Sequence, residues 1–454
     1  MRAGLDELLG AELGWTLDEA LEEPWLGPRE RAALDGLLRL GISAGKRVAI
    51  FYIPGRIEVL GKHTDYAGGR SLLAAAERGF TIATAPRADQ LVTVTDLSTG
   101  QCANSPLNAE LPPDISGWRA YPTTVVRRLA RNFPEARVGA DIVFQSDLPR
   151  AAGLSSSSAF VVGIFLALAV VNRLGSEPAF RRSVGGLTEL GDYLGAVENG
   201  RGYKGLAGDR GVGTQGGSQD QTAILCSRAD HLVRFAFAPV SFEGAVRLPA
   251  GYTFVIASSG VHASKGGAAQ RPYNYAVEVS AALLKLWNRT TQRSDLTLGA
   301  ALSARPDAYD LLYDLIGSGE DTSRHKPAEM RARLEQFRAE TFEYVPAAFR
   351  ALEGADLEAF GEIVDHSQRL AETGLQNQVE ETTFLQRSAR NLGATAASAF
   401  GAGFGGSVWA LVEEGQTRKF LEGWRSAYET AFPVSAGRAI FFETSPAPGT
   451  RRVL

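Results

Sequence analysis

The feature that most constrains the fold is an apolar run, Ala159–Val171, directly behind the small-residue segment Pro149–Ser158. The run is about 13 residues long, whereas a membrane-spanning helix needs ~20. It therefore predicts a helix buried inside a globular protein. We expect this helix over Ala159–Leu174, closed by Gly175, with the small-residue loop at its N-terminus.

The composition excludes several classes of protein. At ~150 residues per domain, 454 residues predict two or three domains. The net charge of −4 argues against a general nucleic-acid binder, and two cysteines, Cys102 and Cys226, exclude a disulfide framework or a cysteine-rich zinc site. The N-terminus lacks the basic-then-apolar order of a signal peptide. We expect a cytoplasmic protein without a membrane or nucleic-acid partner, as a monomer or weak oligomer.

Strand-like and helix-like segments follow one another without strict β-α-β alternation, which favours an α+β fold. Residues 1–45 are expected to be helical and amphipathic. The expected strands are Val48–Ile53, Phe80–Pro86, Leu91–Thr95, Gly139–Gln145, Tyr252–Ser258 and Val408–Val412. Besides residues 1–45 and Ala159–Leu174, the expected helices are 118–132, 272–288, 326–340, 355–371 and 378–392.

Three glycine patterns resemble nucleotide-binding motifs without the structural context that such motifs need. Gly41–Lys46 has short glycine spacing, and Arg47 stands where a P-loop needs Ser or Thr. Gly211–Gly216 and Gly401–Gly406 both match G-x-G-x-x-G, but the first follows a loop and the second precedes a strand-like segment. With 50 glycines in 454 residues, such matches are weak evidence for a dinucleotide site.

The serine-rich loop before the apolar helix is a better candidate for binding phosphate. In Gly153-Leu-Ser-Ser-Ser-Ser158, small residues leave backbone N–H groups accessible at the helix N-terminus, where the helix dipole favours anions. The serine hydroxyls add donors and metal-facing oxygens. The alternative is a capped helix start, in which the serines only satisfy the first-turn N–H groups.

Five segments together resemble the galactokinase family of the GHMP kinases, in the family's order. Pro54–Gly69 is similar to the signature P-G-R-x-N-x-x-G-E-H-x-D-Y-x-G-G, and Gly153–Ala159 to G-L-S-S-S-A. Phe400–Gly406 resembles G-x-G-[FW]-G-G. Trp118–Tyr121 and Gly217–Gln221 are similar to the W-x-N-Y and G-I-M-D-Q segments.

The resemblance implies a two-domain GHMP kinase fold of the α+β class. Residues 1–240 would form the N-terminal domain, similar to domain 2 of ribosomal protein S5, with a helical extension. Residues 241–454 would form a C-terminal α/β sandwich, and the active site would lie in the cleft between the two.

The resemblance also implies ATP and Mg²⁺ as cofactors. Trp118 would pack against adenine, and Mg²⁺ would be held by Ser157 and Glu198. The residues expected around the phosphates are Gly153, Leu154, Ser155, Ser156, Ser157, Gly403 and Gly405.

For catalysis, the resemblance points to Asp220 as the general base and Arg56 as the group that stabilises the transferring charge. His63, Asp65 and Tyr273 would contact the sugar, for which polar donors and acceptors are needed. The structural alternatives are a helix-start carboxylate for Asp220, a surface arginine at a strand end for Arg56, and a β-turn around His63 and Asp65.

Two residues depart from the family signature: Glu58 replaces an Asn, and Lys62 replaces a Glu that faces the C6 hydroxyl of the sugar in the family. An ammonium at Lys62 suits an anionic group such as a uronate carboxylate. Alternatively, Glu58 and Lys62 pair with each other and never meet substrate.

Two further differences concern loops. Glu198 and Asp220 lie 22 residues apart, about ten more than in the family, and the extra residues fall within Gly200–Gly213. That insertion is either a basic cover for the site or a tolerated surface excursion. Ser398–Phe400 replaces a basic residue and a Thr, which leaves the phosphate contacts there open.

We therefore predict an ATP-dependent sugar 1-kinase that phosphorylates the anomeric hydroxyl of galactose or of a C6-acidic relative such as galacturonate. The alternatives are a non-catalytic sugar and ATP sensor, or a kinase for a non-sugar acceptor such as mevalonate or homoserine.

Overall fold

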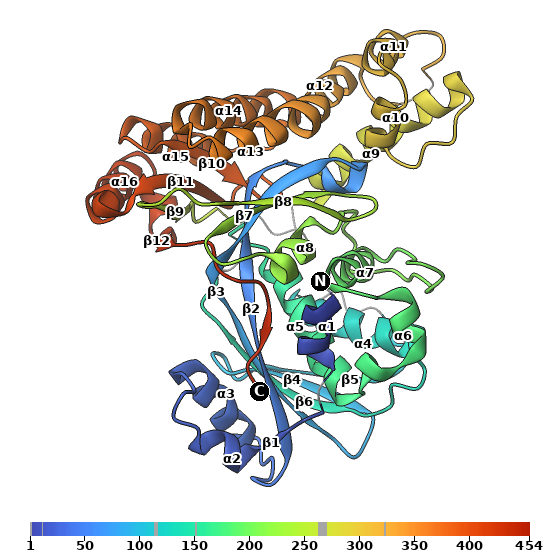
Figure 1. The fold of residues 1–454 in the computed structure, drawn as a ribbon, viewed down its shortest axis with the longest axis vertical. Coiled ribbons are helices and arrows are strands. Elements are labelled where there is room, and N and C mark those ends of the chain that lie inside the picture. Colours follow the sequence, from blue (N-terminus) through green and yellow to red (C-terminus); the bar gives the residue numbers. More distant parts are fainter. Residues whose placement is uncertain (1, 11, 113–116, 150–151, 262–269, 322–323) are drawn as a thin grey trace.

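Two β-sheets organise the chain (Figure 1). The computed structural model describes residues 2–10, 12–112, 117–149, 152–261, 270–321 and 324–454. Within these residues the larger sheet has nine strands and the smaller one has four, with helices packed on both.

The larger sheet has the order β1-β2-β3-β6-β4-β5, with β13 paired to β2 and the β7–β8 hairpin paired to β3. The pair β4–β6 is parallel and the other described pairs are antiparallel. The strands are β1 (Trp15–Thr16), β2 (Arg47–Leu60), β3 (Arg70–Pro86), β4 (Leu91–Asp96), β5 (Cys102–Pro106), β6 (Ala140–Ser146), β7 (His231–Ala236), β8 (Ser241–Arg247) and β13 (Arg451–Arg452).

Helices cover both faces of this sheet. On one face α5 (Ser156–Val171) packs against β2 and β3, and its residues from Ser158 onward are buried, as its apolar sequence predicts. The helix begins three residues before the predicted start, because the serines form its first turn. On the other face α3 (Pro28–Arg39) packs against β3 and β6. Neighbouring residues of β2 alternate between the two cores, Phe51 with α5 and Ile50 with α3.

The remaining helices lie around the large sheet or in an upper layer that runs across its end (Figure 1). In the described part of the chain, none of them combines the length and the apolar character that a membrane span requires. They are α1 (Arg2–Leu9), α2 (Leu17–Glu22), α4 (Ala120–Asn132), α6 (Pro178–Ser183), α7 (Leu187–Asn199), α8 (Gln219–Cys226), α9 (Gln270–Thr291), α10 (Leu298–Ser303), α11 (Ala308–Leu315), α12 (Pro327–Arg338), α13 (Val345–Glu353), α14 (Leu357–Leu370), α15 (Glu380–Asn391), α16 (Thr417–Ala431) and α17 (Pro433–Ala436).

The smaller sheet is antiparallel, with the order β10-β11-β9-β12. Helices α15 and α16 pack on one face around Trp424, and α14 packs on the other beside Trp409. Its strands are β9 (Tyr252–Ser258), β10 (Ala396–Phe400), β11 (Ser407–Glu413) and β12 (Ile440–Thr444).

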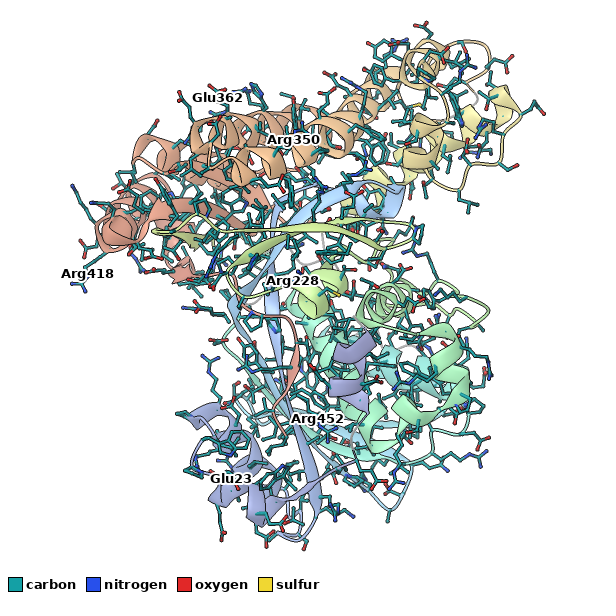
Figure 2. All side chains as sticks on the ribbon, in the orientation of Figure 1. Glu23, Arg228, Arg350, Glu362, Arg418 and Arg452 are labelled. Carbon is teal, nitrogen blue, oxygen red and sulfur yellow. The ribbon has the colours of Figure 1, made fainter. Side chains whose placement is uncertain are left out.

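The sheets divide the chain close to the expected domain boundary, but not at it. The expected boundary between residues 240 and 241 lies inside the β7–β8 hairpin, so the large sheet continues to Arg247 and the small one begins at Tyr252. The end of the chain also returns to the large sheet, where β13 pairs with β2; Arg452 lies there in Figure 2, far from Arg350 on the upper helices.

Candidate active site

The second half of β2 carries the first motif to the centre of the molecule. The strand keeps pairing with β3 past Ile53, with register shifts between Pro54 and Arg56 and between Glu58 and Leu60. Such irregularities are frequent beside active sites, because they redirect side chains. Arg56 and Glu58, two residues apart, lie on the same face of the strand and are buried.

The Arg56 guanidinium joins three groups. Its Nε donates to Asp220 Oδ1 at 2.7 Å, its Nη1 donates to the Gly153 carbonyl oxygen at 2.7 Å, and its Nη2 lies 3.6 Å from Glu58 Oε2. Burial alone lowers the pKa of Arg56, but Asp220 and Glu58 outweigh it, so the pKa lies above its ordinary value. Arg56 therefore stays charged and ties the serine loop to Asp220.

Asp220 belongs to a cluster of oxygen atoms between three helices. It lies in the first turn of α8, so it is also the helix-start carboxylate of the structural alternative. Ser158 Oγ, from α5, lies 2.8 Å from Glu198 Oε2 and 3.3 Å from Asp220 Oδ2. Gln221 Nε2 donates to the same Glu198 oxygen at 2.6 Å. The cluster offers the hard oxygen atoms that Mg²⁺ prefers.

The serine loop presents the N-terminus of α5 and packs directly on the turn after β10. Gly153 has a φ of +77°, and a Cβ there would lie 3.0 Å from the Phe400 carbonyl oxygen, so the close approach needs glycine. Ser155 adopts a left-handed conformation, and its buried Oγ has no hydrogen-bond partner among the described residues. Ser156 and Ser157 are half-buried in the first turn of α5.

The third motif is the turn between β10 and β11, as the strand-like sequence after it predicts. A Cβ at Gly403 would lie 2.3 Å from the Asn377 carbonyl oxygen, and one at Gly405 would lie 2.6 Å from that of Val261. These glycines therefore allow the turn to pack closely on neighbouring backbone. Whether they also contact phosphate stays a prediction.

Trp118 lies in a short 3₁₀ turn, Gly117–Arg119, just before α4. Its half-buried indole packs edge-on against Phe144 and Phe160, and Nε1 donates to Gln101 Oε1 at 3.1 Å. One side of the ring system is thus held by the core, as a stacking platform requires.

Three of the four residues predicted to bind sugar line one pocket. His63 Nε2 lies 3.1 Å from the Ala402 carbonyl oxygen, and the ring centroids of His63 and Tyr273 are 5.0 Å apart. Asp65 Oδ2 accepts from the backbone N–H of Gln219 at 3.1 Å. Burial, followed by the charge of Asp65, raises the pKa of Tyr273 well above its ordinary value, so the phenol keeps its proton.

The pocket is partly open to solvent. Arg56, Glu58, Glu198 and Asp220 also line it. No individual role was predicted for the other wall residues, which are Ser158, Asn199, Thr214, Gly216, Gly217, Gln219, Gln221, Gly401 and Ala402. Gln219 and Gln221 could have been predicted as pocket residues, because they are the sequence neighbours of Asp220.

Comparison with known proteins identifies the family. Family models match three segments: the galactokinase galactose-binding signature at residues 43–86, the N-terminal domain of GHMP kinases at 120–189 and their C-terminal domain at 348–430. A galactokinase of Roseiflexus sp. (strain RS-1) is 28% identical over 385 residues, which are 83% of this chain and 87% of that protein. The chain belongs to the galactokinase branch of the GHMP kinase superfamily.

Other galactokinases show the same relationship. One from Exiguobacterium sibiricum is 25% identical over 89% of this chain and 93% of that protein. The crystal structure of Lactococcus lactis galactokinase complexed with galactose has a TM-score of 0.75 and 22% identity, covering 92% of this chain and 97% of that one. The predicted two-domain GHMP kinase fold is thereby confirmed, and the galactokinase branch implies that ATP is the phosphoryl donor.

Lys62, where the galactokinase signature has Glu, is the predicted sugar contact that does not line the pocket. Its Nζ donates to Ser367 Oγ at 2.9 Å on α14, and Ser367 in turn donates to Glu340. Burial lowers the pKa of Lys62, and the charges of Glu340 and Glu58 oppose this. The placement agrees better with a buried internal charge than with recognition of a uronate.

Glu58, where the galactokinase signature has Asn, does line the pocket. Burial raises its pKa to about 7, and the charges of Arg56 and Lys62 oppose that effect. The folded chain therefore holds this proton more tightly than the unfolded chain, whose carboxyl has the ordinary value of 4.5. The stability that comes with the proton is complete below pH 4.5 and is lost as the pH rises through 7.

We expect Glu58→Gln, which stays neutral at every pH, to unfold at higher urea concentration than the wild type at pH 8. The expected gain is at most about 3 kcal/mol of unfolding free energy, and it should disappear at pH 4.5. Urea unfolding of both proteins at the two pH values measures this. An equal difference at both pH values would contradict the raised pKa.

The insertion that this chain has relative to other galactokinases, Gly200–Gly213, is anchored on α4. The side chain of Asp209 is buried and accepts from Arg127 Nε at 2.8 Å, and Arg128 Nη1 lies 3.6 Å from its other oxygen. Asn132 Nδ2 donates to the Ala207 carbonyl oxygen at 3.0 Å. The loop is thus part of the packed structure, and its continuation, Thr214–Gly217, forms a wall of the pocket.

Asp209→Asn is expected to destabilise the protein by about 3 kcal/mol, because it leaves two buried guanidinium groups without a charged partner. Urea unfolding at neutral pH measures the loss. As a control, Asp230→Asn removes the exposed partner of Arg247 and should change stability by less than about 0.5 kcal/mol. Equal effects of the two substitutions would show that the insertion is not anchored by this charge.

Proposed function

We propose that this kinase transfers the γ-phosphoryl group of ATP to the anomeric hydroxyl of a neutral, galactose-like sugar. The observation that carries the proposal is the 2.7 Å contact of Arg56 with Asp220, in a pocket that His63, Asp65 and Tyr273 also line. Asp220 takes the proton of the attacking hydroxyl, and Arg56 stabilises the charge that develops on the transferring group. Phosphoryl transfer depends mainly on this kind of positioning and electrostatics.

The residues around the pocket fit a nucleotide with its metal ion. The N-terminus of α5 and the unpartnered Ser155 hydroxyl offer donors for phosphate oxygens, and Trp118 offers a platform for adenine. Ser157 and Glu198, joined by Ser158, would hold Mg²⁺. When bound, the ion neutralises phosphate charge. We also propose that the reaction takes place in the cytoplasm, where ATP is supplied.

The charge of the pocket supports a neutral sugar rather than a uronate. Four carboxyl groups line it, those of Glu58, Asp65, Glu198 and Asp220. Among the described residues, Arg56 is the only arginine or lysine that lines it. All three arms of Arg56 already have partners. A uronate carboxylate would therefore meet like charges without a free cation.

A substrate panel tests this function. The purified chain with ATP and Mg²⁺ is expected to phosphorylate galactose at C1, detected by phosphorus NMR, with kcat/KM at least about tenfold above that for galacturonate. Mevalonate and homoserine should not react. Binding of sugar and ATP without turnover would instead favour a sensor, and preference for galacturonate would contradict the charge argument.

A further inference from the structure

Glu58 has an unused hydrogen-bond acceptor beside the pocket. The residue lines the pocket and is 3% exposed. Its Oε2 accepts from Gln219 Nε2 at 2.8 Å and lies 3.6 Å from Arg56 Nη2. Its Oε1 is buried and has no hydrogen-bond partner among the described residues. A buried carboxylate oxygen without a partner is costly, so such an atom calls for an explanation.

The neighbouring donors are committed elsewhere. The Gln219 amide nitrogen already serves Glu58 Oε2, and its oxygen accepts from Ser71 Oγ at 2.8 Å. The Lys62 ammonium is held by Ser367. The Arg56 arms point to Asp220, the Gly153 carbonyl oxygen and Oε2 of Glu58 itself. Because Glu58 lines the pocket, a ligand bound there is a candidate donor to Oε1.

We propose that Glu58 is a sugar-contacting, specificity-determining residue whose Oε1 accepts a hydrogen bond from one hydroxyl of the bound sugar. The inference rests on the proposed function, because it takes the pocket to hold the sugar. Glu58 lies two residues after Arg56 on β2, and its Oε2 is 3.6 Å from Arg56 Nη2, which places it beside the proposed reacting centre. A sugar hydroxyl is the right class of donor, because it is neutral and adds no charge next to four carboxyl groups.

Deoxy sugars provide the test, because each lacks one hydroxyl. The kcat/KM of galactose is compared with those of its 2-, 3-, 4- and 6-deoxy forms in the wild type and in Glu58→Met, which keeps the chain length without an acceptor. In the wild type, the sugar that lacks the bonded hydroxyl should react at least about tenfold less efficiently than galactose. In Glu58→Met that penalty should shrink about tenfold, while the other three stay unchanged.

Two further variants keep the result interpretable. Glu58→Gln retains a polar atom at the same place and should restore most of the penalty, which a merely structural role would not do. Glu189→Gln, a matched change on α7 outside the pocket, should leave all four penalties unchanged. If Glu58→Met folds poorly, Glu58→Ala replaces it.

The outcomes separate this inference from the proposed function. If the wild type phosphorylates galactose but all four penalties stay within about twofold in the Met or Ala variant, the contact does not exist and the inference is overturned. If the wild type phosphorylates no sugar at all, the proposed function is wrong and the inference falls with it.

Discussion

Asp220→Asn is expected to lower kcat about 10³-fold, the largest effect predicted for a single residue of this protein. The asparagine keeps the size of the side chain, and it can still accept from Arg56 through its oxygen and donate to Ser158 Oγ through its amide nitrogen, but it cannot take a proton from the sugar hydroxyl. General-base catalysis contributes about 10²- to 10⁴-fold in enzymes of this kind. Steady-state kinetics with galactose and ATP measures the loss.

Binding and a matched variant separate the chemical role of Asp220 from a structural one. The Kd values for galactose and ATP, measured by calorimetry, should change by no more than a few fold in Asp220→Asn. Asp192→Asn changes a half-buried carboxylate outside the pocket, which accepts from Ser218 Oγ at 3.0 Å, and this variant should keep its activity. Retention of most of the turnover in Asp220→Asn would rule out its role as the base.

Arg56→Lys is expected to lower kcat by about 10²-fold or more, although the positive charge is kept. The guanidinium joins Asp220, the Gly153 carbonyl oxygen and Glu58 in three directions, whereas a lysine ammonium is a single point at the end of a flexible chain. Loss of one well-placed electrostatic contact in a transition state typically costs 10²- to 10³-fold, so about this loss is expected.

The distribution of this effect between kcat and KM tests the proposed role of Arg56. An interaction made mainly in the transition state lowers kcat and leaves KM for both substrates nearly unchanged. Arg87→Lys serves as the control, because Arg87 also forks onto carboxylates, Asp89 and Asp141, but lies outside the pocket. If Arg56→Lys keeps kcat within about fivefold, the geometry of the fork is not required.

The order of structural elements was largely predictable, because hydrophobic periodicity reports on local structure. The segments 252–258 and 408–412 are strands, and 326–340, 355–371 and 378–392 are helices, with ends shifted by a few residues. The strand expected at Val48–Ile53 is longer in the structure than predicted. It continues to Leu60 as β2. This second half was not expected, because the buried polar residues Arg56 and Glu58 line the pocket and so break the expected alternation.

The candidate site was predictable where a motif names its residues and not where packing places them. Arg56, His63, Asp65, Asp220 and Tyr273 do meet around one pocket. Which residue of the pair Glu58 and Lys62 faces that pocket was not predictable. The answer depends on the irregular register of β2 and on α14, which supplies Ser367 from more than 300 residues away.

The sequence by itself determined the family and the α+β class and singled out the loop that we propose binds phosphate, since these depend on short motifs and on local hydrophobic patterns. Only the tertiary structure decided which groups the charged side chains contact. It buries Lys62 against Ser367, leaves one oxygen of Glu58 without a partner among the described residues and anchors Asp209 on α4. These outcomes depend on long-range contacts between segments that are distant along the chain, and no local pattern encodes such contacts.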